Sequence, residues 1–312
     1  PTSDSGTVTG TLPGTTFAGH QTRVLFDAPE ASRILSVTAN PYSMGVSWFN
    51  GNPSVTGTLH ALNWSTDANG LPTAYDGYGS LGMVTVNSGA TTSMADINLT
   101  RAMDARITGT ITAPAGFTVS SKRLSLRLPF GTTTLLAEET NANLFWAINA
   151  PQLPNATFTL RAGAATAGFA RTTSFTRQGL SPGTVNLTLP LPSPPQLALP
   201  LDAAPGIALA TQRFTWAPMV PAGLYQATIH AGTRHFHVYT RDAEFVLPPT
   251  NELGVGSFPT GSAMSWTVVS YGGGVTTTDA LTAPAGTFSS GLTPDTGDVW
   301  YGQAETRTFQ TN

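Results

Sequence analysis

Three of the five histidines in the chain lie in one short segment, QATIHAGTRHFHVYT, residues 226–240. If this segment is a β-hairpin that turns at AGTR, His230 lies opposite His235, and His237 follows two residues later on the same face. Opposed residues lie about 4.5–5.5 Å apart, so three imidazoles in this pattern could bind one zinc ion. The spacing predicts His230, His235 and His237 as candidate metal ligands.

The face of the hairpin decides what these histidines can do. If Ala227 and Ile229 point into a core, all three imidazoles point outward, where no walls exclude water, and only Asp242 and Glu244 follow as nearby carboxylates. A polar outer face or a subunit contact explains these three histidines better than a metal site does, and such a contact would weaken below about pH 6.5 as the imidazoles become charged. We expect a contact surface, with metal binding as the alternative.

Other patterns that resemble catalytic or metal sites have simpler explanations. GLSPG, residues 179–183, matches the G-x-S-x-G pattern of hydrolases, but Pro182 follows the serine and has no N–H for an oxyanion hole. DANG, residues 67–70, lacks the further oxygen ligands of a calcium loop and is typical of a turn. Glu138 and Glu139 are neighbours on an expected strand and would point to opposite faces. We therefore expect no enzyme and no cofactor.

Three aromatic residues are candidates for ligand binding. Trp300 and Tyr301 are adjacent in GDVWYGQ, which we expect to lie in an inserted loop, and Trp64 lies in a segment that we also expect to be a loop. Aromatic rings in loops can stack on sugars or on the apolar patch of a partner. The alternative is that these rings cover the open end of a hydrophobic core.

Composition narrows the class of protein. Charged residues make up only 10% of the 312 residues, against about 25% in a typical soluble protein, and Gly and Pro are abundant. The net charge of -3 offers no electrostatic footprint for nucleic acid or anionic membrane. The chain has no cysteine, which excludes disulfides within it, and Lys122 is its only lysine. No apolar run reaches 18 residues, so the sequence predicts no transmembrane span.

The pattern of apolar residues predicts an all-β fold. Helix signals are nearly absent, and short alternating runs bounded by Gly, Pro and Asn recur along the chain. Strands are expected in SVTGTLHAL, RLSLRL, ATFTLRA, TVNLTLPL, LYQATIH, HFHVYT and SWTVVSY. The length is sufficient for two or three domains of about 100 residues. We expect tandem antiparallel β-sandwiches of the immunoglobulin-like or transthyretin-like kind.

The first two-thirds of the chain look like a tandem duplication. Residues 8–12, within GTVTGTLPG, match residues 107–111, within ARITGTITAPAG. VTGTLHAL matches ATFTLRA, so that Thr56 aligns with Thr157. Each unit has room for about seven strands, the rhythm of a β-sandwich. The motifs V-x-G-x-(L/I) and F-x-L-x-A resemble the carboxypeptidase-regulatory-like, transthyretin-like sandwiches of bacterial surface proteins.

These matches divide the chain into units. The two repeats are expected at residues 1–100 and 101–190, and residues 63–82, which have no counterpart in the second repeat, are expected to form an elaborated loop. LPLPSPPQLALPLD follows, and its prolines predict an extended spacer. The remainder, 191–312, contains the spacer and a third domain with an insertion at about 272–303.

The third domain resembles a fibronectin type III domain. The resemblance rests on QRFTWAP with Trp216, GLYQATIH with Tyr225 and GSAMSWTVVSYG with Trp266. It implies a sandwich whose core is built around these three aromatic residues.

Together these observations predict a non-enzymatic secreted or surface-exposed structural protein, such as a spacer, an adhesin or an assembly component. The alternatives are a carbohydrate-binding module assembly and a metal-binding surface protein that uses the histidine hairpin. Partners would be proteins or further copies at the cell surface, or a polysaccharide. The opening PTSDSGTVTG is typical of the region after a cleaved signal peptide or a lipidated cysteine. We expect an extracellular or outer cell surface location, with a lipid anchor before Pro1 as one mode of attachment.

Overall fold

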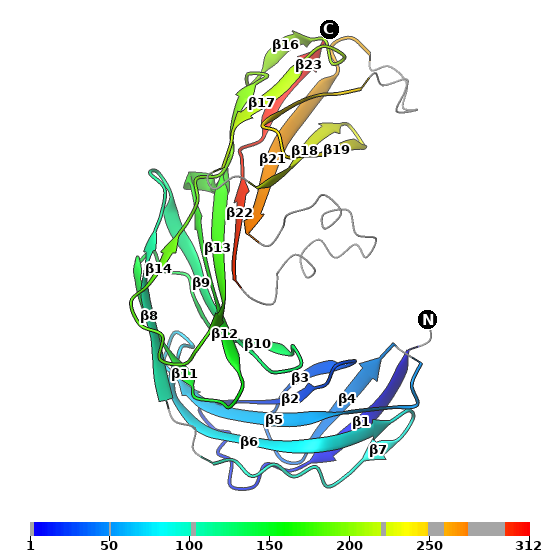
Figure 1. Cartoon of the computed structure of the whole chain (residues 1–312), viewed down its shortest axis with the longest axis vertical. Coiled ribbons are helices and arrows are strands. Elements are labelled where there is room, and N and C mark those ends of the chain that lie inside the picture. Colours follow the sequence, from blue (N-terminus) through cyan, green and yellow to red (C-terminus); the bar gives the residue numbers. More distant parts are fainter. Residues whose placement is uncertain (1–2, 50, 101–103, 220–222, 249–258, 274–296) are drawn as a thin grey trace.

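The computed structural model describes residues 3–49, 51–100, 104–219, 223–248, 259–273 and 297–312. These ranges consist almost entirely of strands and turns, which confirms the all-β prediction. Three sandwich-like units follow one another along a curved axis (Figure 1), and each surrounds a hydrophobic core. Within the described ranges, no helix is long and apolar enough to cross a membrane.

The first sandwich packs a three-stranded sheet on a four-stranded sheet. The smaller sheet has the order β4 (Tyr42–Trp48), β1 (Asp4–Gly10), β7 (Thr91–Thr92). The larger sheet has the order β3 (Ser32–Ser36), β2 (His20–Asp27), β5 (Ser54–Thr66), β6 (Pro72–Asn87). All pairs are antiparallel except β1 with β7, which is parallel.

The second sandwich repeats this topology strand for strand. Its smaller sheet has the order β11 (Phe145–Pro151), β8 (Asp104–Thr112), β14 (Leu187–Pro190). Its larger sheet begins with β10 (Thr133–Glu139), β9 (Thr118–Arg127), β12 (Thr157–Ala165), β13 (Thr172–Leu180). The parallel pair β8 with β14 corresponds to β1 with β7. The topology agrees with a duplication that preserved the order of seven strands.

The glycine of the motif, which reads V-x-G-x-L in the first repeat and I-x-G-x-I in the second, has the same physical role in both sandwiches. A Cβ on Gly10 would lie 2.2 Å from the carbonyl oxygen of Ala95, and one on Gly109 would lie 2.1 Å from that of Leu187. These distances are far below van der Waals contact, so only glycine lets the first strand approach the last segment of its repeat. The motif is therefore a packing requirement of the fold.

The third sandwich contains the aromatic core expected from the sequence. Its smaller sheet has the order β15 (Gln196–Leu199), β17 (Arg213–Ala217), β20 (Glu244–Val246). The facing strands are β16 (Ala204–Ile207), β18 (Leu224–Ala231), β19 (Arg234–Thr240), β21 (Ala263–Gly273), β23 (Arg307–Thr311). Trp216, Tyr225 and Trp266 are all buried between the two layers, as predicted.

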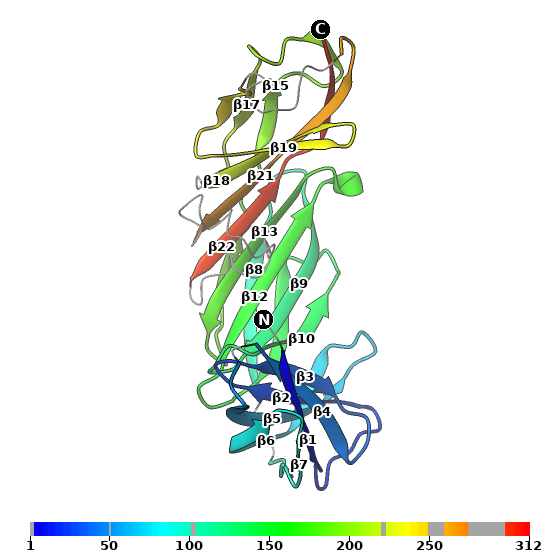
Figure 2. The ribbon, with the colours of Figure 1, turned by 90° about the vertical axis from the view of Figure 1, so that its right-hand side faces the viewer.

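One sheet runs through both the second and the third sandwich. Strand β22 (Asp298–Gln303) pairs with β13 on one side and with β21 on the other, giving the order β10-β9-β12-β13-β22-β21-β18-β19 (Figure 2). The prediction of an inserted loop at about 272–303 is therefore wrong for residues 298–303. Residues 274–296 lie outside the described ranges. Because backbone hydrogen bonds cross this junction, the two sandwiches are joined as one sheet.

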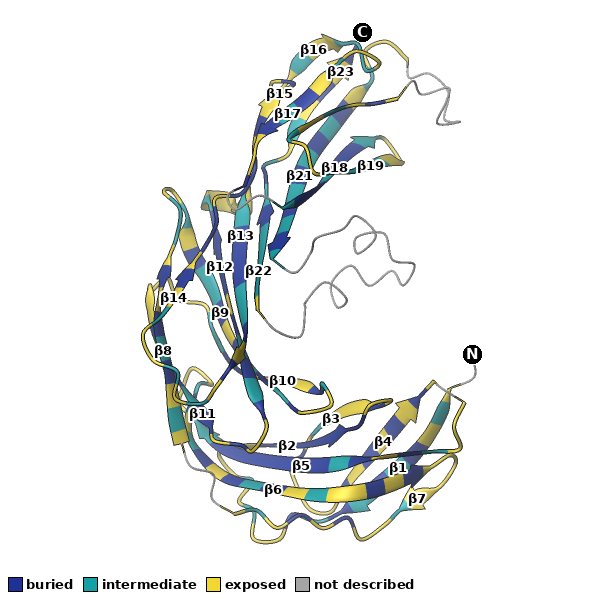
Figure 3. Cartoon of the chain, viewed as in Figure 1, coloured by how far each residue is buried: buried dark blue, intermediate teal, exposed yellow. Residues whose placement is uncertain are grey.

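The junction between the first two sandwiches corrects a second expectation. Residues 63–82 are not a loop, because β5 and β6 continue as a long hairpin through most of this segment. Figure 3 shows that buried positions continue along β5 toward the second sandwich. Trp64 and Tyr75 are fully buried and belong to the core of the second sandwich. The long hairpin of the first sandwich thus contributes side chains to the core of the second sandwich.

Polar contacts lock the same junction. The carboxylate of Asp27, which is fully buried, accepts the backbone N–H of Phe130 at 2.9 Å and of Thr132 at 3.0 Å. Arg23 donates to the Thr134 hydroxyl at 2.5 Å, and its guanidinium lies 5.2 Å from the centre of the Trp64 ring. Strand β2 is thereby fastened to the turn between β9 and β10.

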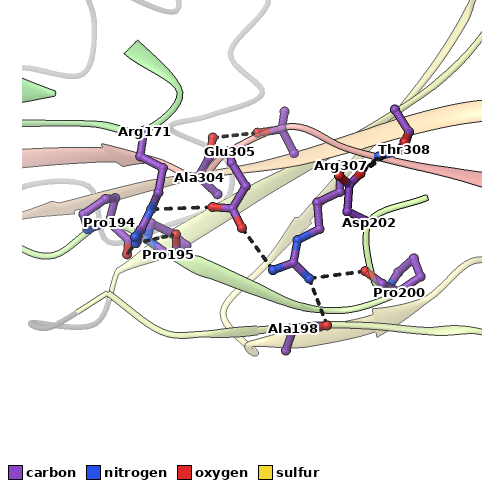
Figure 4. Close-up of polar contacts among 11 residues, drawn as sticks. Arg171, Pro194, Pro195, Ala198, Pro200, Asp202, Ala304, Glu305, Arg307 and Thr308 are labelled. Carbon is purple, nitrogen blue, oxygen red and sulfur yellow. Dashed lines mark hydrogen bonds and ion pairs between the residues drawn. The ribbon is translucent and has the colours of Figure 1, made fainter. Parts of the chain in front are cut away.

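The proline-rich segment between the second and third sandwiches is extended, but two arginines hold it (Figure 4). Arg171 donates to the carbonyl of Pro194 at 3.2 Å, and Arg307 donates to the carbonyl of Ala198 at 3.0 Å. Glu305 lies between them, 3.5 Å from the Nε of Arg171 and 3.2 Å from an Nη of Arg307. Side chains of both sandwiches thus fasten the segment that the sequence predicts to be an extended spacer.

Candidate functional site

The histidine hairpin has the predicted register. His230 on β18 pairs with His235 on β19, and their rings meet edge to face with centroids 4.6 Å apart. The two Nδ1 atoms are 2.6 Å apart. One of these nitrogens must carry the hydrogen and the other must accept it, so the contact requires at least one neutral imidazole.

The third histidine does not join this pair. His237 lies opposite Thr228, and its Nδ1 is 3.1 Å from Nε2 of Gln226 and 3.2 Å from the Thr228 hydroxyl. Across the described residues, no group of three or more His, Asp or Glu side chains is placed to hold a metal ion. The predicted three-histidine ligand set is therefore not assembled. His230 and His235 contact each other, whereas His237 contacts side chains of the neighbouring strand β18.

Two histidines make folding sensitive to pH. Burial lowers the pKa of His60, and partial burial together with His235 and His230 lowers the pKa of His237. An unfolded histidine titrates at about 6.5, so below that pH the unfolded chain binds more protons than the folded chain. We expect the free energy of unfolding to fall as the pH drops below about 6.5 and this contribution to level off below the folded pKa values.

Urea denaturation at a series of pH values measures this effect. His60→Gln can keep a hydrogen bond to Tyr78, whose hydroxyl lies 3.0 Å from the imidazole. The variant should show a shallower loss of stability than the wild-type protein between about pH 7 and about pH 5, because the buried titrating group is gone. Identical slopes for the two proteins would refute the assignment to His60.

The three aromatic candidates lie in strands, which corrects their expected place in loops. Trp64 is fully buried and cannot contact a ligand. Trp300 and Tyr301 are both partly buried in β22, where successive side chains point to opposite faces of the sheet. Trp300 stacks on Phe175 with ring centroids 6.3 Å apart, on the side of the second core. Trp300 also lines a cavity of about 460 Å³ together with Phe175, Arg177 and Asp298, whereas Tyr301 lies beside a cavity on the outer face of the sheet.

An arginine groove crosses that outer face. It consists of two adjoining cavities of about 380 and 280 Å³ that share Arg123 and Arg161. The i, i+2 spacing of β9 and β12 places the lining side chains on one face, and Figure 2 looks onto this side of the sheet. The principal lining residues are Arg123, Ser125, Arg127, Thr159, Arg161 and Tyr301.

Charge in the arginine groove is incompletely balanced. Arg123 pairs with Glu138 at 2.7 Å. Arg161 has no carboxylate partner among the described residues, and its guanidinium donates to the Ser174 hydroxyl at 3.5 Å. Partial burial and then the neighbouring charge of Arg123 lower the pKa of Arg161. An anion placed between these two guanidinium groups would be stabilised by both.

Asp67, Glu138 and Glu139, which were considered from the sequence, have structural partners. Asp67 accepts the backbone N–H groups of Asn69 at 2.8 Å and Leu71 at 2.9 Å, and these bonds lower its pKa, so it closes its own turn. Glu138 and Glu139 point to different partners, as predicted, because Glu139 pairs with the buried amine of Lys122 at 2.7 Å. Sequence reasoning missed both Arg161 and the surroundings of Lys122.

No protein family model matches the sequence, and no curated protein sequence matches it. Weak similarity to several solved structures is found, including the following three. The Bacillus anthracis TIE protein is 9% identical with a TM-score of 0.20, over 84% of this chain and 45% of that one. A leucine-rich repeat protein from Bacteroides thetaiotaomicron is 11% identical with a TM-score of 0.21, over 60% and 26%. A Streptococcal ancillary pilin is 8% identical with a TM-score of 0.19, over 85% and 89%.

The chain thus spans less than half the length of the first two of these proteins. At this level of similarity the comparisons carry no argument about function. The proposals that follow rest on the residues and contacts of the chain itself.

Proposed function

We propose that the protein is a non-enzymatic structural protein, secreted or exposed at the cell surface, in which three sandwiches form a stiff curved spacer. The observation that carries this proposal is the construction of the two junctions. Trp64 is buried in the core of the neighbouring sandwich, and β22 joins the second and third sandwiches in one sheet. Modules connected by flexible linkers have no need of such contacts.

The finer identity of the modules belongs to the same proposal. The first two sandwiches would be carboxypeptidase-regulatory-like modules, supported by their shared order of seven strands. The third would be a fibronectin type III-like module, supported by its core of Trp216, Tyr225 and Trp266. A lipid anchor before Pro1 would hold the array at the outer surface, where it could present adhesive faces or contact further copies.

Location at the surface can be tested on intact cells of the source organism. An antibody against the purified protein should label unpermeabilised cells, and external protease should remove the label. A matched antibody against a cytoplasmic protein should label only permeabilised cells. If the first antibody also labelled cells only after permeabilisation, the proposal would be contradicted.

The arginine groove favours a second candidate function, which is binding of a carboxylated polysaccharide. The charge of Arg161, which has no carboxylate partner in the part of the chain that the structure describes, matches a uronate carboxylate, and the hydroxyls of Ser125, Thr159 and Tyr301 suit the hydroxyl groups of sugars. The groove is shallow and continuous across two cavities, so it fits a chain laid across the sheet better than an enclosed small molecule.

Binding of polygalacturonate at low ionic strength tests this function, with neutral dextran as the comparison polymer. We expect Arg161→Gln to weaken binding about tenfold, because a charge-assisted hydrogen bond is lost. Arg106→Gln, which alters an exposed arginine on β8 in the opposite sheet, should leave affinity unchanged. Equal losses in the two variants, or equal binding of dextran, would exclude the groove as the site.

A further inference from the structure

Lys122 is the only lysine among the 14 cationic Lys and Arg residues of the chain. Its side chain is fully buried, on the same face of β9 as the core residues Leu124 and Leu126. For a buried ion pair arginine is the more suitable residue, because its guanidinium is weakly hydrated and forms two parallel bonds. A lysine amine, unlike a guanidinium, can lose its proton and act as a nucleophile. The chain therefore uses lysine only at a position where nucleophilic chemistry is possible.

The surroundings of Lys122 contain the other groups that an amide exchange needs. Its Nζ lies 2.7 Å from Oε2 of Glu139 and 2.5 Å from Oδ1 of Asn141. The Nδ2 of Asn141 donates to the same Glu139 oxygen at 3.3 Å. One carboxylate thus contacts both the amine and the nitrogen that would leave. The side-chain amide carbon of Asn141 is bonded to the oxygen that Nζ already touches.

We propose that Lys122 and Asn141 form an intramolecular isopeptide bond, with Glu139 carrying the protons. Glu139 takes a proton from the Lys122 ammonium, and the neutral Nζ attacks Cγ of Asn141. The bond from Cγ to Nδ2 then breaks, Glu139 returns its proton to Nδ2, and the second Nζ proton leaves with the same nitrogen. The products are one new amide, one ammonium ion and the regenerated Glu139 carboxylate. No oxidant or cofactor takes part.

The location of the three residues suits this reaction. Glu139 ends β10, and Asn141 follows in the exposed connection to β11, so the departing ammonium reaches solvent directly. Lys122 lies on β9, and the pairing of β9 with β10 places it directly opposite Glu139. The bond would fasten this connection to the sheet in a chain that has no cysteine and hence no disulfide. This inference goes beyond the spacer role and does not depend on it.

The mass of the intact denatured protein tests the proposal. The wild-type chain, produced without additional lysines, should be lighter than its sequence mass by one ammonia molecule. Tandem mass spectrometry should find a branched peptide that joins Lys122 to Asn141. A wild-type mass equal to the sequence mass would overturn the proposal and leave Lys122 as the partner in an ion pair only.

The single lysine provides a second measurement. Lysyl endopeptidase cleaves after an unmodified lysine, so a denatured wild-type chain with the isopeptide bond should resist it. Asn141→Ala keeps the lysine and removes the acceptor, so the denatured variant should be cut into two fragments and should have its full sequence mass. Glu139→Gln should behave in the same way. Because the wild-type mass is read without any variant, the test remains decisive even where a variant fails to fold.

Discussion

Trp64→Ala is expected to lower the free energy of unfolding by about 3–5 kcal/mol, the range for removal of a large aromatic side chain from a core. Trp64 is fully buried, and its neighbours come from both sandwiches. The ring packs near Tyr75 with centroids 6.1 Å apart and lies beneath the guanidinium of Arg23. Removing it leaves a cavity at the junction, where the two units have to move together for the space to collapse.

Urea denaturation followed by fluorescence and circular dichroism measures this loss. Phe49→Ala provides the control, because Phe49 is 68% exposed and its removal should change stability by no more than about 0.5 kcal/mol. If the two variants were equally stable, Trp64 would have to be accessible to solvent, as expected for an aromatic residue in a binding loop.

Asp27→Ala is expected to lower the free energy of unfolding by about 3 kcal/mol, since bonds to a charged acceptor contribute about 1.5–3 kcal/mol each and do not add fully. The buried carboxylate of Asp27 accepts two backbone N–H groups from the turn between β9 and β10. Alanine leaves both donors without an acceptor in a site that water does not reach. The penalty therefore comes from unsatisfied groups as well as from the lost bonds.

The chain offers a matched control for this substitution. Asp202 also accepts two groups, the backbone N–H of Thr308 at 2.8 Å and its hydroxyl at 3.1 Å, but it is exposed to water. Asp202→Ala should therefore cost clearly less than Asp27→Ala in the same denaturation experiment. A loss at Asp27 no larger than the loss at Asp202 would show that the junction does not depend on a buried carboxylate.

Local pattern was sufficient to predict much of the fold. Alternation identified the strands, and the pairing of His230 with His235 followed from the turn alone. The burial of Trp216 and Trp266 was expected from the resemblance of their short sequence motifs to a fibronectin type III domain. These features depend on residues that are close in sequence, where the period of two and the turn residues carry the information.

The junctions could not be read in this way. Residues 63–82 were identified as extra sequence because the second repeat has no counterpart for them. The missing counterpart does not distinguish a loop from a longer hairpin. Trp300 lies in a short segment that contains two glycines, and it pairs across the sheet with Phe175 on β13 of the second sandwich. Such distant pairing leaves no local signal, so both segments were expected to be loops.

The candidate sites show the same division. The histidine hairpin was visible in the sequence, yet its contacts separated His237 from the other two. Arg161 has no distinctive motif, and its importance comes from the absence of a carboxylate partner among the described residues. Lys122 carried one usable signal, because it is the only lysine and it occupies an apolar position of SSKRLSLRL. Its partners Glu139 and Asn141 became evident only in three dimensions.

Small-angle X-ray scattering of the full chain in solution tests the central claim most directly, because the claim is that the two junctions hold three sandwiches in one stiff curved body. The account predicts that the profile calculated from the structure (Figure 1), with its sandwiches kept in a single relative orientation, fits the measured profile. A profile that only a broad set of sandwich orientations can reproduce would contradict the claim.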